Sequence, residues 1–176
     1  AEVSLRAAAD ALPMLMVSGD YEQARMILAR VSIDPEDISP RTAAPGLLSP
    51  FRTLIMAADV LGDQETATRL TLTWAGALAR PESDTRRSPT TQRSNADASL
   101  APSFRALVSS SWHLFPNEAR EGVVEILRER LKTVSSVQSR GMLASYVLQL
   151  SAAINKPLDD AIDLGAMAVT GQERNI

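Results

Sequence analysis

Apolar residues recur every three or four positions along most of the chain, the spacing that places side chains on one face of an α-helix. Eight segments follow this pattern, and none alternates apolar and polar residues as a half-buried β-strand does. Pro13 stands inside the first segment and predicts a kink there or the separation of its first turns. The pattern predicts an all-α chain of about eight helices.

The buried face of each predicted helix follows from these stripes. The predicted inner positions, helix by helix, are Leu5, Ala8, Ala9, Leu12, Leu15 and Met16; Ala24, Ile27, Leu28 and Val31; Phe51, Leu54, Ile55, Ala58 and Leu61; Ala67, Leu70, Thr71, Trp74 and Leu78; Phe104, Leu107, Val108 and Ser111; Val123, Val124, Leu127, Leu131 and Val134; Leu143, Val147, Leu150 and Ile154; and Leu158, Ala161, Ile162 and Val169.

Capping residues mark where several helices begin. Asp20 and Asp63 each follow a glycine and precede an apolar stripe, as N-cap residues do. Ser49 and Pro50 are typical of an N-cap and a first helical position. The helices are predicted to pair into four antiparallel hairpins within a single domain of residues 1–176, at about 4–31, 50–79, 102–134 and 137–169.

Two segments break the helical pattern. Four prolines between positions 35 and 50 preclude a long helix and predict an ordered turn or strap. Residues 80–101 are polar, rich in Ser and Thr and without periodicity, so a flexible segment is predicted there. Its arginines beside hydroxyl groups indicate either a docking or phosphorylation element or a solvated loop; they are Arg80, Arg86, Arg87 and Arg93.

A repeat emerges when the hairpins are aligned on an alanine in the first turn of each second helix. The aligned residues are Ala24, Ala67, Ala119 and Ala161, with steps of 43, 52 and 42 residues. Removing roughly ten residues of the 80–101 segment restores the period, and repeats of this length are typical of stacked helical hairpins. A short right-handed α-solenoid is therefore predicted, with an irregular helical bundle as the alternative.

The turn sequences "GDYEQARMIL" and "GDQETATRLT", and the closing "LSAAINKPLDDAIDLGAMAV", resemble those of tetratricopeptide-type repeats. The chain departs from that family in its period, which exceeds the usual length of about 34 residues. It also lacks the usual Trp, Leu-Gly and Tyr positions of the first helix. The resemblance concerns architecture, and it implies protein or peptide binding on a concave face.

Composition narrows the classes of function. Apolar residues make up 45% of the chain and aromatic residues 4%, so a helical core of Ala, Leu, Val, Ile and Met is expected. A net charge of −3 argues against a nucleic-acid partner bound through a basic face. Cysteine is absent, and no apolar run approaches the roughly 20 residues of a membrane span. Ala1 fits an exported mature chain or a piece of a longer protein; a cytoplasmic location is favoured.

Residues with catalytic or metal-binding chemistry are few. His113 is the sole histidine, a general base or metal ligand in one interpretation and a packed or surface imidazole in the favoured one. Ser111 is a poor nucleophile partner for His113, because residues two apart on a helix do not face each other. Asp159, Asp160 and Asp163 form the densest acidic group, explained by the dipole of the helix they start, with a cation site as the alternative.

The aromatic residues and the charged pairs of one helix are the side chains that a partner could contact. The aromatic residues Trp74, Trp112, Phe104 and Phe115 are assigned to the core, with a ligand platform as the alternative. Glu125–Arg128 and Glu129–Lys132 are expected to form i,i+3 pairs on a solvated helix face.

The sequence thus predicts a non-catalytic scaffold or adaptor that binds a protein or peptide in an apolar groove. It predicts no catalytic, cofactor-binding or metal-binding residue. The alternatives are a ligand-sensing domain of a bacterial regulator, a structural subunit of a larger assembly and, least favoured, an enzyme.

Overall fold

The computed structural model of the 176-residue chain describes residues 3–33, 48–80 and 112–173. Within these ranges lie α1 (Leu5–Ser18), α2 (Tyr21–Arg30), α4 (Leu48–Val60), α5 (Gln64–Ala79), the short 3-10 helix η2 (Trp112–Leu114), α7 (Asn117–Thr133), α8 (Val137–Ala153) and α9 (Ala161–Glu173). The described part of the chain contains no β-strand, only an isolated parallel bridge between Val3 and Val31. The predicted all-α class is confirmed.

Some predicted elements lie outside the described residues. These are most of the proline-rich turn, nearly all of the 80–101 segment and the predicted helix that contains Phe104, Leu107, Val108 and Ser111. Within the described ranges, α1 runs without a break through Pro13, so the predicted separation of its first turns is wrong. The α4 helix begins at Leu48, so Ser49 lies inside the first turn and is not its N-cap.

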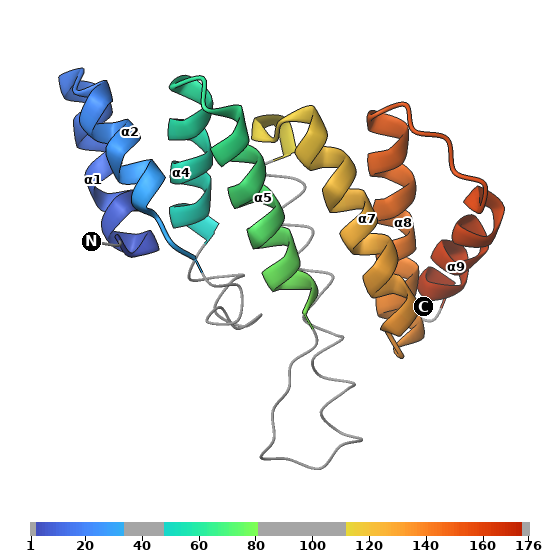
Figure 1. The fold of residues 1–176 in the computed structure, drawn as a ribbon. Coiled ribbons are helices and arrows are strands. Elements are labelled where there is room, and N and C mark those ends of the chain that lie inside the picture. Colours follow the sequence, from blue (N-terminus) through green and yellow to red (C-terminus); the bar gives the residue numbers. More distant parts are fainter. Residues whose placement is uncertain (1–2, 34–47, 81–111, 174–176) are drawn as a thin grey trace, which may run out of the picture.

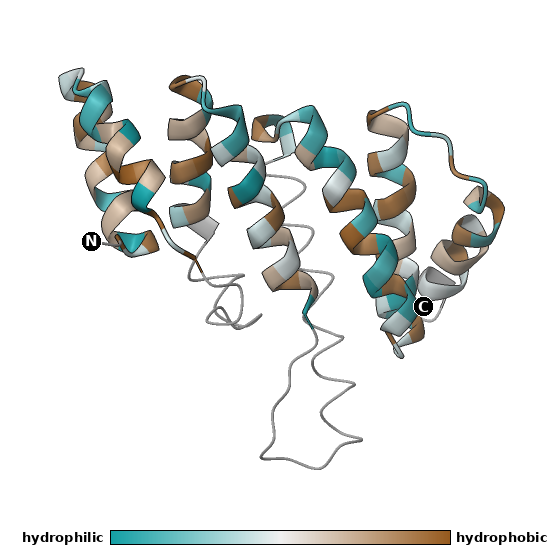
Figure 2. Ribbon diagram, viewed as in Figure 1, coloured by the Kyte–Doolittle hydropathy of each residue, from teal (hydrophilic) through white to brown (hydrophobic). Residues whose placement is uncertain are grey.

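The helices stand side by side in a row that follows their order along the chain (Figure 1). α4 packs against both α1 and α5, α7 packs against both α5 and α8, and α9 packs against α8. α2 contacts α1 and also reaches α4. Brown apolar segments recur along each of these helices between teal polar ones (Figure 2), as expected for helices that bury one face and expose the other.

The same turn closes the first two hairpins. Gly19 and Gly62 adopt left-handed conformations with φ of 79° and 73°, a region that glycine enters without a steric penalty. The amide of the following aspartate donates back to the preceding helix, from Asp20 to the Leu15 oxygen at 2.9 Å and from Asp63 to the Ala58 oxygen at 2.8 Å.

Each of these aspartates then caps the next helix. The Asp20 side chain accepts a hydrogen bond from the Gln23 amide at 3.2 Å, and the Asp63 side chain accepts one from the Thr66 amide at 3.0 Å. Both predicted N-caps are confirmed. The turn after α8 also contains a residue in the left-handed conformation, here Asn155 in place of glycine. Its φ is 54°, an angle that asparagine tolerates better than most residues.

The core is built where the predicted stripes meet. Trp74 is fully buried and stacks on Phe51, with ring centroids 5.5 Å apart and an interplanar angle of 3°. Phe115 closes the cluster in an edge-to-face contact with Trp74 at 6.3 Å. The aligned alanines Ala24 and Ala67 are also fully buried, which lets the second helix of each hairpin approach its neighbours closely.

The face predicted for the last helix is wrong. Ile162 and Val169 are 88% and 56% exposed, and Ala161 is exposed too, whereas Leu164 is buried. The reason is that α9 meets α8 through glycine. A Cβ atom on Gly141 of α8 would lie 2.6 Å from the Cα of Gly171 in α9. The contact face of α9 therefore carries small residues, which a search for large apolar side chains overlooks.

Candidate interaction surface

His113 lies on the surface in the short helix η2. Arg120 hydrogen-bonds the main-chain oxygen of His113 at 3.4 Å, and the Arg120 guanidinium also lies 5.5 Å from the ring centre of Trp112. Trp112 is half-buried and contacts Phe115 edge to face at 6.0 Å. These contacts hold η2 against the start of α7.

The aromatic residues divide between core and surface. Trp74 and Phe115 belong to the core, as predicted, and Trp112 packs against it while remaining partly exposed. Phe104, the fourth residue of that group, lies outside the described residues.

The predicted acidic group lies where α9 begins. Asp160 precedes the helix, and its main-chain oxygen accepts from the Leu164 amide at 3.0 Å, while Asp163 stands in the first turn. The Asp160 carboxylate accepts a hydrogen bond from Arg128 at 2.9 Å. Within the described ranges no three His, Cys, Asp or Glu side chains cluster as metal ligands.

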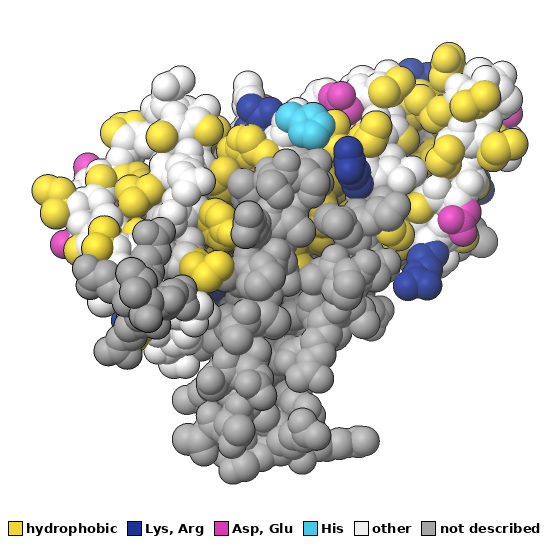
Figure 3. Space-filling view, turned by 180° about the vertical axis from the view of Figure 1, so that it is seen from behind, with side chains coloured by type: hydrophobic (Ala, Val, Ile, Leu, Met, Phe, Trp, Pro, Cys, Tyr) yellow, Lys and Arg dark blue, Asp and Glu magenta, His cyan; other side chains and the backbone are white. Residues whose placement is uncertain are grey.

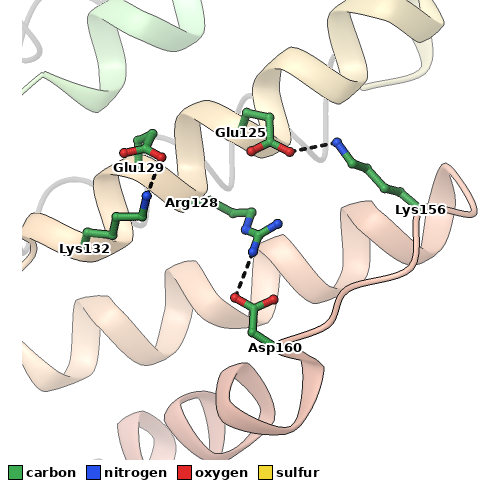
Figure 4. A network of polar contacts seen from close by, with 6 residues as sticks. All are labelled: Glu125, Arg128, Glu129, Lys132, Lys156 and Asp160. Carbon is green, nitrogen blue, oxygen red and sulfur yellow. Dashed lines mark hydrogen bonds and ion pairs between the residues drawn. The ribbon is translucent and has the colours of Figure 1, made fainter.

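A polar network joins α7 to the segment that leads into α9 (Figure 4). Lys156 donates to Glu125 at 2.7 Å, parallel to the Arg128–Asp160 pair. The predicted pairing of Glu125 with Arg128 is therefore wrong, because each side chain reaches across to α9's leading segment instead. The predicted pair of Glu129 and Lys132 is confirmed.

Electrostatics at Glu125 follow from this geometry. The hydrogen bond from Lys156 lowers the pKa of the Glu125 carboxyl below its usual 4.5, and the charges of Lys156, Arg128 and Lys132 act in the same direction, while burial opposes them. The network borders a cavity of about 500 Å³ between α7 and α9. The positive and negative charges of the network largely neutralise one another. We therefore interpret the network as a set of ion pairs that hold α7 to the segment before α9.

A second cavity, of about 320 Å³, lies between α1 and α4 and is almost entirely apolar. This α1–α4 groove is lined by Leu12, Pro13, Met16, Thr53, Met56, Ala57 and Val60. Met56 and Val60 are 43% and 69% exposed. On the side of the molecule seen in Figure 3, yellow hydrophobic side chains gather over α1 and α4, at the right of that view.

Apolar exposure continues beyond the α1–α4 groove onto the outer side of α1. Met14 is 73% exposed and Val17 is 89% exposed. Single exposed apolar residues are ordinary on protein surfaces, whereas a contiguous set beside a groove marks an interaction site. The α1–α4 groove therefore combines an apolar cavity with exposed apolar side chains next to it.

The sequence predicted an apolar groove but not its residues. Met56 and Val60 lie outside the predicted inner stripe of α4, and their four-residue spacing places them together on a second apolar stripe of that helix. A helix with two apolar stripes has more apolar surface than one core contact needs, and this excess was the available signal.

None of the described helices is long and apolar enough to cross a membrane. Comparisons with protein-family models, with characterised proteins and with solved structures find no match for this chain.

Proposed function

We propose that this chain is a non-catalytic scaffold or adaptor that binds a protein or peptide, with its hairpins stacked as a short α-solenoid. The observation that carries the proposal is the α1–α4 groove, an apolar cavity whose walls include the partly exposed Met56 and Val60. Leaving such side chains in water forgoes roughly 25 cal/mol for each Å² that a partner would cover.

The chemistry of the groove suits a protein partner. Methionine has three rotatable bonds and a polarisable sulfur, so it adapts to the shape of a partner side chain. Met16 and Met56 stand on opposite walls of the groove, with Pro13 beside Met16 as a rigid element. Methionine is enriched at protein interfaces relative to the remaining surface.

An enzyme is the less favoured class of protein, because the groups with catalytic chemistry are exposed or paired. A catalytic site needs a general base or nucleophile held in a concave pocket with its partner groups. His113 is exposed, while Glu125 and Asp160 are engaged in ion pairs that fasten α7 to the start of α9. The acidic composition favours a protein partner over a nucleic acid.

One observation favours a second candidate, a structural subunit of a larger assembly. Ile162, Ala166 and Val169 are exposed at i, i+4 and i+7 on α9, so they form an apolar stripe on the outer side of that helix. A neighbouring subunit could cover this stripe as α8 covers the other side.

Affinity capture with matched variants tests the proposal. Met56→Asp places a charge in the groove, and Met26→Asp places one at a site of similar exposure on α2, 47% against 43%. We expect partners captured by the wild-type chain to be lost with Met56→Asp and kept with Met26→Asp. Equal capture by all three chains would count against the groove.

Light scattering tests the second candidate: an oligomer that Ile162→Asp dissociates would favour the structural subunit.

A further inference from the structure

The walls of the α1–α4 groove offer few main-chain groups to a ligand. Both walls are turns of α-helices, in which most amide and carbonyl groups are bonded along the helix. The exceptions are the carbonyl of Ala9, which lacks its usual donor because residue 13 is proline, and the end of α4 at Val60. The lining is apolar apart from Thr53. An extended peptide laid in this groove would bury its own amides and carbonyls without partners, which is unfavourable for each group left unpaired.

We propose that the occupant of this groove is an amphipathic α-helix of a partner protein, a proposal that rests on the proposed function. A helix brings its main-chain hydrogen bonds already formed and presents apolar side chains at spacings of three and four residues. It is thus the form of peptide that fills an apolar groove without leaving main-chain groups unpaired.

The fold itself contains a precedent for this arrangement. α2 packs against α1 and reaches α4, so one helix already lies across this pair. On α4 the groove runs from Thr53 to Val60, which corresponds to about two helical turns or roughly 10 Å. An occupant of about three turns spans this length.

Charges beside the groove give the occupant a direction. α1 and α4 run the same way in Figure 1. On α1, Arg6 is followed one turn later by Asp10, and on α4, Arg52 is followed two turns later by Asp59. All four are exposed. The α4 wall therefore changes from positive to negative along the groove, whereas Arg6 and Asp10 of α1 both precede Leu12, its first lining residue there. The helix dipoles add positive potential at the N-terminal ends.

The partner helix that complements this pattern carries acidic residues at the end near Arg52. Its basic residues lie at the end near Asp59, and its apolar stripe faces Met16 and Met56. Charge complementarity of this kind sets orientation and specificity more than affinity.

The test is a selection from a displayed library of random peptides of about 16 residues, enough for four helical turns. The immobilised baits are the 176-residue chain and its Met56→Asp, Val60→Asp and Met26→Asp variants, each checked for helicity. We expect enriched peptides with apolar residues at i, i+3 or i+4, and i+7. Their affinity should fall at least about tenfold with Met56→Asp or Val60→Asp and stay within about twofold with Met26→Asp.

Two further measurements address the helix and its direction. A proline in the middle of an enriched peptide should weaken binding at least about tenfold, because proline breaks a helix interior. The Arg52→Glu variant should favour peptides whose acidic end has been changed to lysine.

The outcomes separate the two proposals. Enriched peptides that alternate apolar and polar residues, or that tolerate the central proline, would overturn the helix while leaving peptide binding in place. No enrichment, or equal binding to wild type and Met56→Asp, would overturn both. A groove already filled by another part of the chain or by a second copy would give that last result.

Discussion

Gly141 and Gly171 set the distance between α8 and α9. A Cβ atom on Gly141 would lie 2.6 Å from the Cα of Gly171 and 2.8 Å from the main-chain oxygen of Met167. These neighbours are main-chain atoms, which cannot turn aside as a side chain does. Other helices of the row contact each other through large apolar side chains. α8 and α9 instead pack with their backbones close together.

Gly141→Ala should therefore destabilise the protein. We expect a loss of about 1–3 kcal/mol in the free energy of unfolding, because the methyl group forces α9 away from α8. Urea denaturation measures this loss. Gly165→Ala is the matched control: open space surrounds that position within α9, so the gain in helix propensity, up to about 1 kcal/mol, should remain. A Gly141→Ala protein as stable as wild type would contradict the close packing.

Gly122→Ala should be tolerated, in contrast to Gly141→Ala. A Cβ atom on Gly122 would meet the Cδ2 atom of Leu72 at 2.5 Å, and that atom is the end of a flexible side chain. A rotation of Leu72 relieves the contact, and the gain in helix propensity within α7 offsets its cost. We expect the free energy of unfolding to change by less than about 1 kcal/mol. A larger loss would show that Leu72 cannot move.

Asp63→Ala should remove the cap of α5. The lost hydrogen bond to the Thr66 amide is expected to cost about 0.5–2 kcal/mol in the free energy of unfolding. Asp63→Asn keeps a side-chain acceptor while removing the charge, so its stability should stay close to that of the wild type. Equal losses in the two variants would indicate that the charge of Asp63, and not the hydrogen bond, stabilises the helix.

Lys156→Met should raise the pKa of Glu125 toward 4.5, because the hydrogen bond from Lys156 is the largest cause of its lowering. NMR titration of the Glu125 carboxyl measures this change. Lys132→Met is the control, since Lys132 acts on Glu125 only through its charge and should raise the pKa less. A larger rise with Lys132→Met would contradict the assigned pairing.

The same pair makes a small, pH-dependent contribution to stability. The pKa of Glu125 is lowered in the folded state, so the contribution is present above pH 4.5 and is lost as the pH falls through the folded-state pKa. The Lys156 and Glu125 side chains are 33% and 49% exposed, and solvent screening limits the effect to about 1 kcal/mol or less.

Much of the fold could be predicted from the sequence, because the helices carry local signals. The glycine-aspartate pairs at 19–20 and 62–63 specify a left-handed turn followed by a cap, and both form as predicted. Of the four aligned alanines, Ala24, Ala67 and Ala119 are buried, since each lies in the first turn of a helix that packs on two neighbours, whereas Ala161 is exposed.

The features that could not be predicted depend on contacts between different helices. The exposed face of α9 could not be predicted, because its closest contact with α8 is made by glycine, which carries little hydrophobic signal. Glu125 finds its partner in Lys156, 31 residues away, instead of the nearby Arg128. Periodicity also cannot say whether a second apolar stripe, such as Met56 and Val60, is covered by another helix or left open.

The arrangement of the helices in a row has a consequence for folding. Each described helix packs mainly against its neighbours in the row, so the row is held together by contacts between adjacent helices. The ends of such a row can open while the middle stays closed. α5, with seven buried residues in the centre, should retain its amide protons longest, and the helices at the two ends of the row should exchange theirs sooner. A partner seated between α1 and α4 would slow exchange at that end of the row and leave the rate in α9 nearly unchanged.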